Sequence, residues 1–416
     1  MTDQKTQQIL TNWKETTLGE TGIVITGKTP SKDNPKDWGD CLDFITPTDF
    51  VSESKYLSSV DRKLSEDGKE RFQRMIIPSG SVIVTCIGSD MGKVVINKND
   101  CLTNQQINSI IVNPDFDRDF IFYSLKYAYP ILRIHADGGS TMPILNKSTF
   151  EALSLPFPPF PEQRAIASVL SAFDDKIELL REQNKTLEAI AQTLFNRWFV
   201  EFNFPDENGQ PYLDSGGKMI DSELGEIPEG WRFGKLGDEL EVVMGQSPKG
   251  ETYNTENDGM EFYQGRADFG ERFPTIRLFT TDPMKVAEPM DVLLSVRAPV
   301  GEINQTLRKC CIGRGLAAIR SNYKSYTFYR LFNEQEKIKL YEDSGTVFGS
   351  ITKSAIENIE YVVPSQDTVR QFEEKVHILD QKIFNNHFQI QALSQLRDTL
   401  LPKLMRGEMR VKGFSD

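Results

Sequence analysis

The sequence lacks any run of apolar residues long enough to cross a membrane, and its polar start, MTDQKTQQIL, is unlike a signal peptide. These two absences predict a cytoplasmic protein. The three histidines do not cluster near the cysteines, and no CxxC spacing occurs among Cys41, Cys86, Cys101, Cys310 and Cys311. The pattern therefore favours neither a structural zinc site nor a disulfide framework.

Motifs of common enzyme classes are also missing. The sequence contains no GxxxxGK[ST], GxGxxG or HExxH motif. A catalytic Cys or Ser needs a general base, and the chain has only three histidines that could serve as one. One phrase, Asn113-Pro114-Asp115-Phe116, is close to the Asn-Pro-Pro-Tyr/Phe site in which amino-methyltransferases hold a base amino group. Its third residue is Asp, and no Gly-rich S-adenosylmethionine loop precedes it, so we interpret it as a turn at a strand end. The sequence argues against an enzyme, with no catalytic, cofactor-binding or metal-binding residues.

An excess of positive charge is absent as well, since the net charge is −12. This balance argues against nonspecific nucleic-acid binding. A DNA-binding protein of this composition must gather its positive charge locally, on one face. The length of 416 residues, with 26% charged and 38% hydrophobic residues, suits a globular chain of about two to four domains.

What the sequence does have is a long helical seam that occurs twice. In the first copy, spacings of four and three residues separate apolar positions on both sides of Asn184, which predicts a coiled-coil helix over residues 161–200. The second copy follows 206 residues later, over residues 366–416, and contains Asn386. The first seam consists of Ile166, Leu170, Phe173, Ile177, Leu180, Leu187, Ala191, Leu194 and Trp198.

The two Asn residues indicate how the helices pair, because a buried Asn is tolerated in a seam mainly when it meets a polar group. Antiparallel pairing sets Asn184 opposite Asn386, whereas parallel pairing sets each opposite an apolar residue. One mixed pair results, in which the stem of Arg397 covers Phe173 and its head reaches water. The same scheme pairs Leu170 with Leu400, Leu187 with Ile383, and Trp198 with Phe372. An ordinary helix hairpin in a core remains the alternative, although each seam is about 50 Å long.

The segments that precede the helices repeat too. Residues 18–30 resemble residues 236–248, residues 44–50 resemble 262–269, and residues 145–153 resemble 351–359. Strand pairs around a Gly turn are expected at 81–96 and 291–305. Pro161 and Glu162 suit the first turn of the first helix, the second is entered through residues 364–367, and Gly407 ends it.

These repeats predict a mixed α/β protein with two globular domains in tandem. Two long antiparallel coiled-coil helices join and separate the domains, with pseudo-two-fold symmetry. The expected order is a globular domain at 1–160, a helix at 161–200, a second globular domain at 201–365 and a second helix at 366–416.

Four phrases lie next to or within the two helices, GSTMPILNKSTFEAL (139–153), LPFPPFPEQRAIASVL (155–170), LEAIAQTLFNRWFVEFNFP (187–205) and LRDTLLPKLMRGEMRV (396–411). Through these phrases the chain resembles the specificity subunit of type I restriction and modification systems, in which the two globular domains are target-recognition domains. The resemblance implies a noncatalytic adaptor that reads a split double-stranded DNA target with two domains. It also implies two modification subunits, which bring S-adenosylmethionine, and restriction subunits that join the complex. The second helix departs from the pattern, because it lacks the Pro-Glu-Gln phrase that opens the first.

Base-reading residues are expected in loops, where Arg and Lys suit guanine and Asn and Gln suit adenine. For any one candidate, a solvated side chain or a phosphate contact is the commoner role. The candidates in the first domain are Lys28, Thr29, Lys32, Lys36, Ser140 and Thr141. Those in the second are Gln246, Lys249, Arg266, Arg297, Arg314 and Thr346.

Two alternatives to the adaptor stay open. The first is a fused adenine methyltransferase that uses residues 113–116, and binding of S-adenosylmethionine by the lone chain would identify it. The second is a helical scaffold with no role on DNA. A salt-dependent, sequence-preferring DNA complex formed with a methyltransferase partner would exclude the scaffold.

Overall fold

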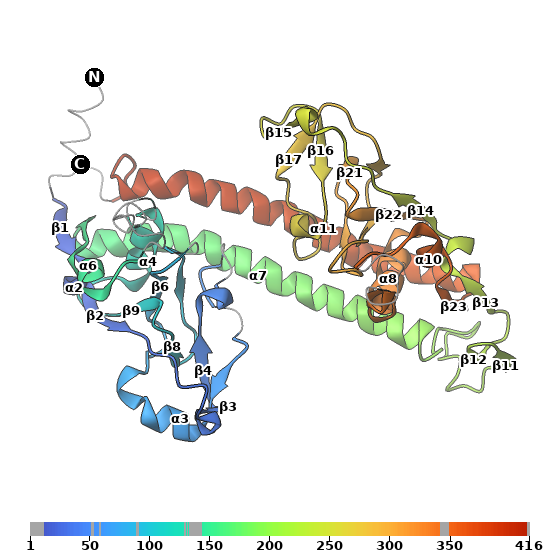
Figure 1. Ribbon diagram of the computed structural model, residues 1–416, viewed down its shortest axis with the longest axis horizontal. Helices are drawn as coiled ribbons and strands as arrows, with labels where there is room; N and C mark the ends of the chain where they lie inside the picture. The colour runs from blue at the N-terminus through green and yellow to red at the C-terminus, as the bar shows by residue number, and fades with distance from the viewer. Residues whose placement is uncertain are drawn as a thin grey trace. The chain divides into compact units, whose positions relative to one another are not determined.

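The computed structural model describes residues 12–50, 54–57, 60–88, 91–128, 130, 132, 144–341 and 349–413. The chain divides into two compact units. Unit 1 runs up to Glu182 and takes in the chain again from Asn386, and unit 2 consists of Gln183–Asn385. Each unit contains a globular part and a portion of each long helix, α7 (Phe160–Phe199) and α11 (Gln366–Met405), shown in Figure 1. The predicted mixed α/β class is confirmed.

The main sheet of unit 1 has four antiparallel strands in the order β2, β9, β6, β7. Strand β6 is apolar without alternation because both of its faces are buried. Val82 and Val84 pack in the cluster that includes residues of α7, whereas Ile83 belongs to a second cluster. The predicted strand pair at 81–96 is confirmed. The strands are β2 (Gly22–Thr26), β6 (Val82–Thr85), β7 (Val94–Ile96) and β9 (Ile107–Val112).

A second sheet of unit 1 has the order β3, β5, β4, β8, in which only β4 and β8 are parallel. Its strands are β3 (Trp38–Gly39), β4 (Leu42–Ile45), β5 (Lys63–Leu64) and β8 (Cys101–Thr103). A separate pair joins β1 (Lys14–Thr17) to β10 (Ser154–Phe157). In unit 1 the described helices outside α7 and α11 are α2 (Leu18–Thr21), α3 (Glu66–Arg71), α4 (Arg118–Tyr127) and α6 (Lys147–Ala152), with 3-10 turns η1 (Pro35–Asp37), η2 (Pro47–Asp49) and η3 (Gln73–Met75).

Unit 2 repeats this order of strands. Its main sheet is β14, β22, β19, β20, and its second sheet is β15, β17, β16, β21, β18, where β16 and β21 are the parallel pair. The predicted strand pair at 291–305 is confirmed as β19 and β20. The main sheet comprises β14 (Glu241–Met244), β19 (Val292–Ser295), β20 (Ile303–Gln305) and β22 (Leu316–Arg320). The second comprises β15 (Tyr253–Asn254), β16 (Met260–Tyr263), β17 (Leu278–Thr280), β18 (Val286–Ala287) and β21 (Cys310–Ile312).

Further elements of unit 2 complete the repeat and add a hairpin. Strand β13 pairs with β23 as β1 pairs with β10 in unit 1. The hairpin of β11 and β12 belongs to the segment that follows α7. The elements are β11 (Met219–Ser222), β12 (Gly225–Pro228), β13 (Arg232–Lys235), β23 (Glu360–Val363), α8 (Lys324–Lys339), α10 (Lys353–Glu357), η4 (Leu236–Asp238), η5 (Gly250–Thr252) and η6 (Arg266–Asp268).

The ends of the long helices follow the sequence signals. Pro161 lies in the first turn of α7, where a missing backbone N–H is harmless. At the start of α11 the Ser365 hydroxyl accepts a hydrogen bond from the backbone N–H of Thr368 at 3.1 Å. Beyond its last turn, Gly407 has φ +67°, and its N–H donates to the carbonyl of Leu404 at 3.1 Å.

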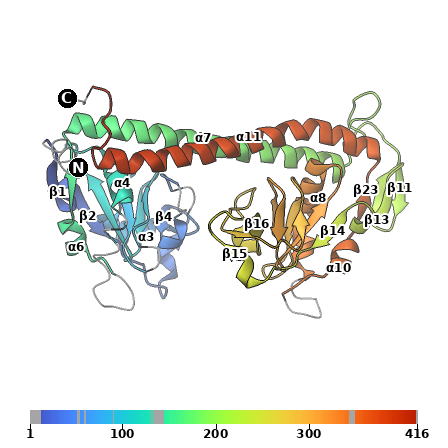
Figure 2. The same ribbon diagram turned by 90° about the horizontal axis from the view of Figure 1, so that it is seen from above.

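Within each unit the portions of the two helices lie side by side and run in opposite directions (Figures 1 and 2). In unit 1 the Arg410 guanidinium binds Glu162 at 3.0 Å, while Asp174 on α7 binds Arg397 on α11. In unit 2 the ring of Phe372 lies 5.8 Å from that of Trp198. Asn184 and Asn386 fall in different units, so their pairing stays a prediction.

The expected environment of Arg397 is wrong. Its side chain is only 2% exposed, and its guanidinium donates to Asp174 at 2.5 Å and to Asp398 at 2.9 Å instead of reaching water. The seam scheme matched Arg397 with Phe173. The neighbouring Asp174 supplies the buried charge partner, because a cation that loses its water needs a carboxylate more than a ring.

A tyrosine and an aspartate connect the globular part of each unit to a long helix. In unit 1 the hydroxyl of Tyr123, on α4, donates to Asp174 on α7 at 2.5 Å. In unit 2 the hydroxyl of Tyr329, on α8, donates to Asp380 on α11 at 3.0 Å. Figure 2 shows α4 and α8 next to the long helices of their units. These buried contacts fix the globular part on the helix pair.

Candidate nucleic-acid interface

In unit 1 the residues that follow four strands meet at one edge of the sheets. The loop after β2 is bonded to the end of β8, since the N–H of Lys28 donates to the carbonyl of Thr103 at 2.8 Å. The segment after β8 is bonded to the end of β4, from Asn104 N–H to Ile45 oxygen at 3.0 Å. The chain after β6 joins through Cys86. We call the residues 27–30, 46–49, 86–88 and 103–106 edge 1.

Unit 2 builds the same edge with the same backbone bonds. The N–H of Gln246 donates to Ile312 oxygen at 2.9 Å, and that of Gly313 donates to Tyr263 oxygen at 2.8 Å. The chain after β19 joins through a bond from Val296 to Gly315 at 2.9 Å. We call the residues 245–248, 264–268, 296–302 and 313–315 edge 2. Four loops brought together by one hydrogen-bond scheme form a surface that can vary in side chains without changing its frame.

In each edge one glycine allows two loops to approach this closely. A Cβ on Gly27 would lie 2.2 Å from the carbonyl oxygen of Thr103, and one on Gly245 would lie 2.1 Å from that of Gly313. Both distances are far inside van der Waals contact with backbone atoms. The loop after β2 can therefore lie directly against the turn after β8, and the loop after β14 against the turn after β21, only because these residues have no side chain.

The turns at 103–106 and 313–315 place one exposed side chain each at equivalent positions, Gln105 and Arg314. Arg314 is among the residues that the sequence predicts, whereas Gln105 is not. Comparison of the two repeated segments could have identified Gln105. Both residues stand two positions after the end of a strand, β8 or β21, and two positions before the start of the next.

Several other predicted residues lie at the two edges. In edge 1, Lys28 is exposed, and the hydroxyl of Thr29 donates to Oε1 of Gln105 at 2.5 Å. The exposed members of edge 2 include Gln246, Arg266 and Arg297. The structure thus brings together residues that are far apart in the sequence, and it does so through the loops that carry them.

Other predicted residues lie elsewhere. Lys36 is exposed in η1, where its carbonyl oxygen accepts a bond from Ser65 at the start of α3. Lys36 lies just before β3, and β3 pairs with β5 next to Leu42, the first residue of β4. Edge 1 follows the last residue of β4, so Lys36 lies at the opposite end of that strand. Lys32 and Lys249 are exposed in the segments that leave the edges. Ser140, Thr141 and Thr346 lie outside the described residues.

Edge 2 carries three arginines that are not paired with its own carboxylates, Asp268 and Glu302. Asp268 is buried, accepts a bond from the N–H of Gln264 at 2.6 Å, and is paired with Arg277. Among the residues that the structure describes, Arg266, Arg297 and Arg314 form no ion pair. The local positive charge that a DNA-binding protein of net charge −12 requires is therefore available here.

The candidate methyltransferase phrase forms a turn, as expected. Strand β9 ends at Val112, and the N–H of Phe116 donates to the carbonyl of Asn113 at 3.0 Å. The Asn113 amide itself donates to the carbonyl oxygen of Glu20 at 3.2 Å. That amide is therefore engaged in holding the turn on α2.

Two buried thiols of unit 1 are poorly suited to nucleophilic chemistry. Burial raises the pKa of Cys86 and of Cys101 to about 12, so both thiols are protonated at neutral pH and are poor nucleophiles. No group of three His, Cys, Asp or Glu residues suited to a metal ion is present in the described part of the chain. None of its helices is both long and apolar enough to span a membrane.

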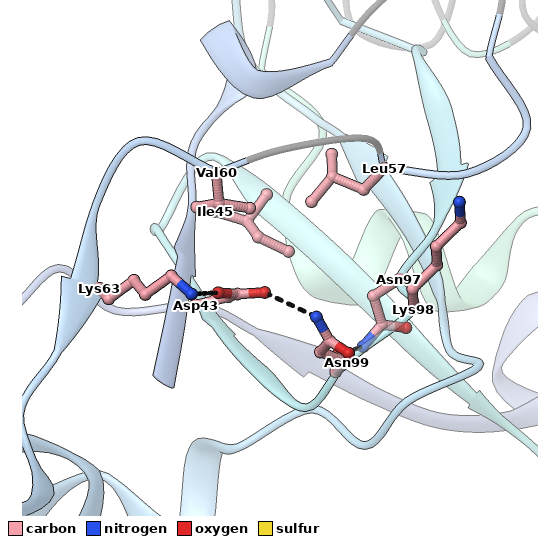
Figure 3. A pocket seen from close by; sticks show the side chains of 8 residues that line it. All are labelled: Asp43, Ile45, Leu57, Val60, Lys63, Asn97, Lys98 and Asn99. Atoms are coloured by element: carbon pink, nitrogen blue, oxygen red, sulfur yellow. Dashed lines mark hydrogen bonds and ion pairs between the residues drawn. The ribbon is translucent and has the colours of Figure 1, made fainter. Parts of the chain in front are cut away.

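A hollow of about 290 Å³ in unit 1 is lined by residues of β4, β5 and the turn after β7 (Figure 3). Three of its polar groups are bonded together, because Asp43 is paired with Lys63 at 3.2 Å and accepts a bond from Asn99 at 3.3 Å. The turn that contains Asn99 joins β7 to β8, at the end of β8 opposite edge 1. We assign this hollow no part in nucleic-acid contact.

Comparison with known proteins identifies relatives of the whole chain. Residues 11–189 match the family model described as type I restriction modification DNA specificity domain. The chain is 32% identical to the type I restriction enzyme MjaIX specificity subunit of Methanocaldococcus jannaschii, over 96% of this chain and 94% of that protein. It is 24% identical to the MjaVIII specificity subunit of the same organism, over 92% and 95% of the two chains.

A solved structure shares the fold. It is the type I restriction-modification system S subunit from M. genitalium, which is 20% identical to this chain. The match covers 94% of this chain and 96% of that one, with a TM-score of 0.56.

Proposed function

Because the chain belongs to the family of type I restriction enzyme specificity subunits, we propose that it reads a two-part DNA sequence for a modification and restriction complex. Unit 1 reads one part through edge 1, and unit 2 reads the other through edge 2. The chain is a noncatalytic recognition subunit. It binds no cofactor of its own, and the S-adenosylmethionine is brought by the modification subunits.

The observation that carries this proposal is the pair of edges. The two share their backbone hydrogen bonds, their glycines and the position of their exposed tips, but Lys28, Thr29 and Gln105 in edge 1 correspond to Gln246, Ser247 and Arg314 in edge 2. A constant frame with different exposed polar side chains is what two readers of different half-sequences need. A helical scaffold with no role on DNA does not account for this pattern.

The long helices support a second part of the proposal, in which they act as the spacer between the reading domains. Each helix continues without interruption for 40 residues. We propose that they form an antiparallel coiled coil with Asn184 opposite Asn386 and with approximate two-fold symmetry. The domains extend over 1–160 and 201–365, and the spacer helices over 161–200 and 366–416.

We also propose that two modification subunits dock on the helices and domains and that restriction subunits join them, in the cytoplasm. Apolar side chains on the outer surfaces of the helices support this. Ile190 on α7 is 50% exposed, and Leu396 on α11, its equivalent in the repeat, is 53% exposed. Large exposed apolar side chains at repeated positions suit a surface that is covered in a complex.

The sites modified by the assembled complex test the proposal. The chain and a modification subunit are purified together, incubated with DNA and S-adenosylmethionine, and the methylated positions are sequenced. We expect two constant half-sequences separated by a gap of fixed length. One uninterrupted sequence, or modification with no sequence preference, would contradict the two-reader proposal.

Calorimetry of the purified chain with S-adenosylmethionine separates the adaptor from a methyltransferase. We expect no heat of binding from the chain alone and a clear signal once the modification subunit is added. Measurable binding by the chain alone would overturn the noncatalytic assignment.

A further inference from the structure

Gln105 and Arg314 occupy the same place in the two edges, although the residues themselves differ. Each lies in the two-residue tip of a turn that joins a strand of the second sheet to a strand of the main sheet. The residue after each tip position, Gln106 or Gly315, accepts a backbone bond from Cys86 or Val296, at 2.7 and 2.9 Å. The frame therefore holds the two side chains in equivalent positions, and both are exposed.

The environment of Gln105 prepares its amide for one base. The Thr29 hydroxyl donates to Oε1 at 2.5 Å, which fixes the amide plane and leaves the two N–H donors of Nε2 available. An amide oxygen has a second lone pair, so Oε1 can still accept a bond from another donor. A group that donates and accepts side by side matches the N7 acceptor and the N6 amino group of adenine in the major groove.

Arg314 offers donors alone, which match another base. Its guanidinium forms no ion pair among the described residues, and its backbone N–H is held by the Ser247 hydroxyl at 3.2 Å. A Cβ on Gly315 would lie 2.6 Å from the Gln264 carbonyl oxygen, so the tip is packed tightly on the neighbouring loop. The guanidinium presents two parallel N–H donors from a backbone that is held in place. Such a pair of donors matches the O6 and N7 acceptors of guanine.

We propose that Gln105 and Arg314 are the equivalent base-reading residues of the two units, Gln105 selecting an adenine in one half-sequence and Arg314 a guanine in the other. The proposal rests on the proposed function and specifies it further. It assigns Thr29 as a positioning residue, which acts by orienting the Gln105 amide. It also predicts that one base position in each half-sequence changes identity when its reader is exchanged.

The test exchanges the two side chains, one at a time, in the full chain assembled with its modification subunit. Each complex selects DNA from a pool in which the half-sequences of the wild-type site are randomised, and the bound DNA is sequenced. We expect Gln105→Arg to replace adenine with guanine at one position of one half-sequence. We expect Arg314→Gln to replace guanine with adenine in the other half. Each preference should be roughly tenfold to a hundredfold.

Matched controls and truncations accompany the exchanges. Arg308→Gln removes an exposed arginine from the turn between β20 and β21, outside edge 2. This arginine pairs with Glu261 at 3.6 Å. Gln73→Arg adds a guanidinium at an exposed position of η3, outside edge 1. Neither should change the selected sequence.

Gln105→Ala and Arg314→Ala should each remove the preference at one position only, which keeps the test valid if an exchanged side chain does not fit. Thr29→Val should weaken the adenine preference without replacing it.

The outcomes distinguish this inference from the function on which it rests. If wild-type selection yields no split sequence, the proposed function is wrong. If it does, but the exchanges and truncations leave both half-sequences unchanged, only the assignment of Gln105 and Arg314 is wrong. A uniform loss of affinity for all sequences, with a shallower salt dependence, would identify phosphate contacts and would also overturn the assignment.

Discussion

The two units fasten their globular parts to the long helices with the same tyrosine and aspartate, but they neutralise the aspartate differently. In unit 1 the cation is Arg397, which comes from the opposite long helix. In unit 2 it is Arg272, which comes from the globular part and binds Asp380 at 3.0 Å. The position equivalent to Arg397 is Ala191, a fully buried residue. A buried carboxylate needs a cation, but the fold leaves open which element provides it.

The edges differ from the helix attachments, because they share a backbone frame and not their side chains. Their backbone bonds and close glycine contacts are nearly identical, whereas most of their exposed side chains differ. Where the units hold their fold together, the tyrosine and the aspartate recur and the cation differs. Where they face solvent at the loop ends, only the frame recurs. This division is what a repeated scaffold with two different targets requires.

The largest expected effect comes from removing the cation of unit 1. Arg397→Met leaves the Asp174 carboxylate, 3% exposed, without its buried charge partner. We expect the free energy of unfolding in urea to fall by about 3–5 kcal/mol. Adding Asp174→Asn should recover part of that loss, because an uncharged amide needs no cation.

The control for this variant is Arg370→Met, which removes an exposed arginine paired with Asp367 at 2.9 Å on the same helix. It should change the stability by less than about 0.5 kcal/mol. If Arg397→Met were no more destabilising than this control, the buried pair would not be what fastens unit 1. Arg272→Met makes the matching test in unit 2.

A smaller effect is expected from the glycines of the edges. Gly27→Ala and Gly245→Ala each place a Cβ against a backbone oxygen at 2.2 and 2.1 Å. We expect each to lower the free energy of unfolding by about 1–3 kcal/mol, measured by thermal denaturation. Gly250→Ala, whose Cβ would meet no atom within 4 Å, is the control. Equal stability of all three variants would show that the edges are looser than the hydrogen bonds indicate.

The smallest effect concerns pH and should occur in unit 2 alone. Burial raises the pKa of Glu188 above 4.5 although Arg272 lies 3.5 Å away, and the equivalent residue in unit 1 is Ser394. A raised folded-state pKa adds stability that is present below about 4.5 and is lost as pH rises through the folded value. Urea titrations between pH 4 and pH 7 should therefore show a smaller decline for Glu188→Gln than for the wild type. An identical pH profile would mean that Glu188 ionises as freely in the folded chain as in the unfolded one.

Much of the fold could be predicted because it depends on patterns that are local or repeated. The seams at Ile166 and Leu170, the turn at Gly407 and the strand pairs all follow from spacing and turn chemistry within short windows. Arg397 could not be placed in this way. Its partner Asp174 is 223 residues distant and lies beside the seam, so only the packed helices reveal it.

The candidate site was predicted less completely than the fold. A search for basic residues in loops finds Arg266, Arg297 and Arg314, but it also selects Lys36, which stands at the other end of its sheet. It misses Gln105, because a neutral residue in a two-residue turn has no distinctive composition. Aligning the turns of the two units would have found it opposite Arg314.

The most direct test of the central claim lengthens the proposed spacer without touching either edge. Seven residues are inserted in α7 between Lys176 and Glu182 and in α11 between Gln389 and Ser394, which keeps the seam in phase. Each helix grows by about 10 Å, at roughly 1.5 Å per residue. With base pairs about 3.4 Å apart, the sequenced methylation sites should show a gap longer by about three base pairs and unchanged half-sequences. The added pairs also rotate one half-site by roughly a third of a turn, so affinity should fall unless the DNA twists to compensate. An altered half-sequence, or efficient modification at the original gap, would contradict two reading units held apart by the helices.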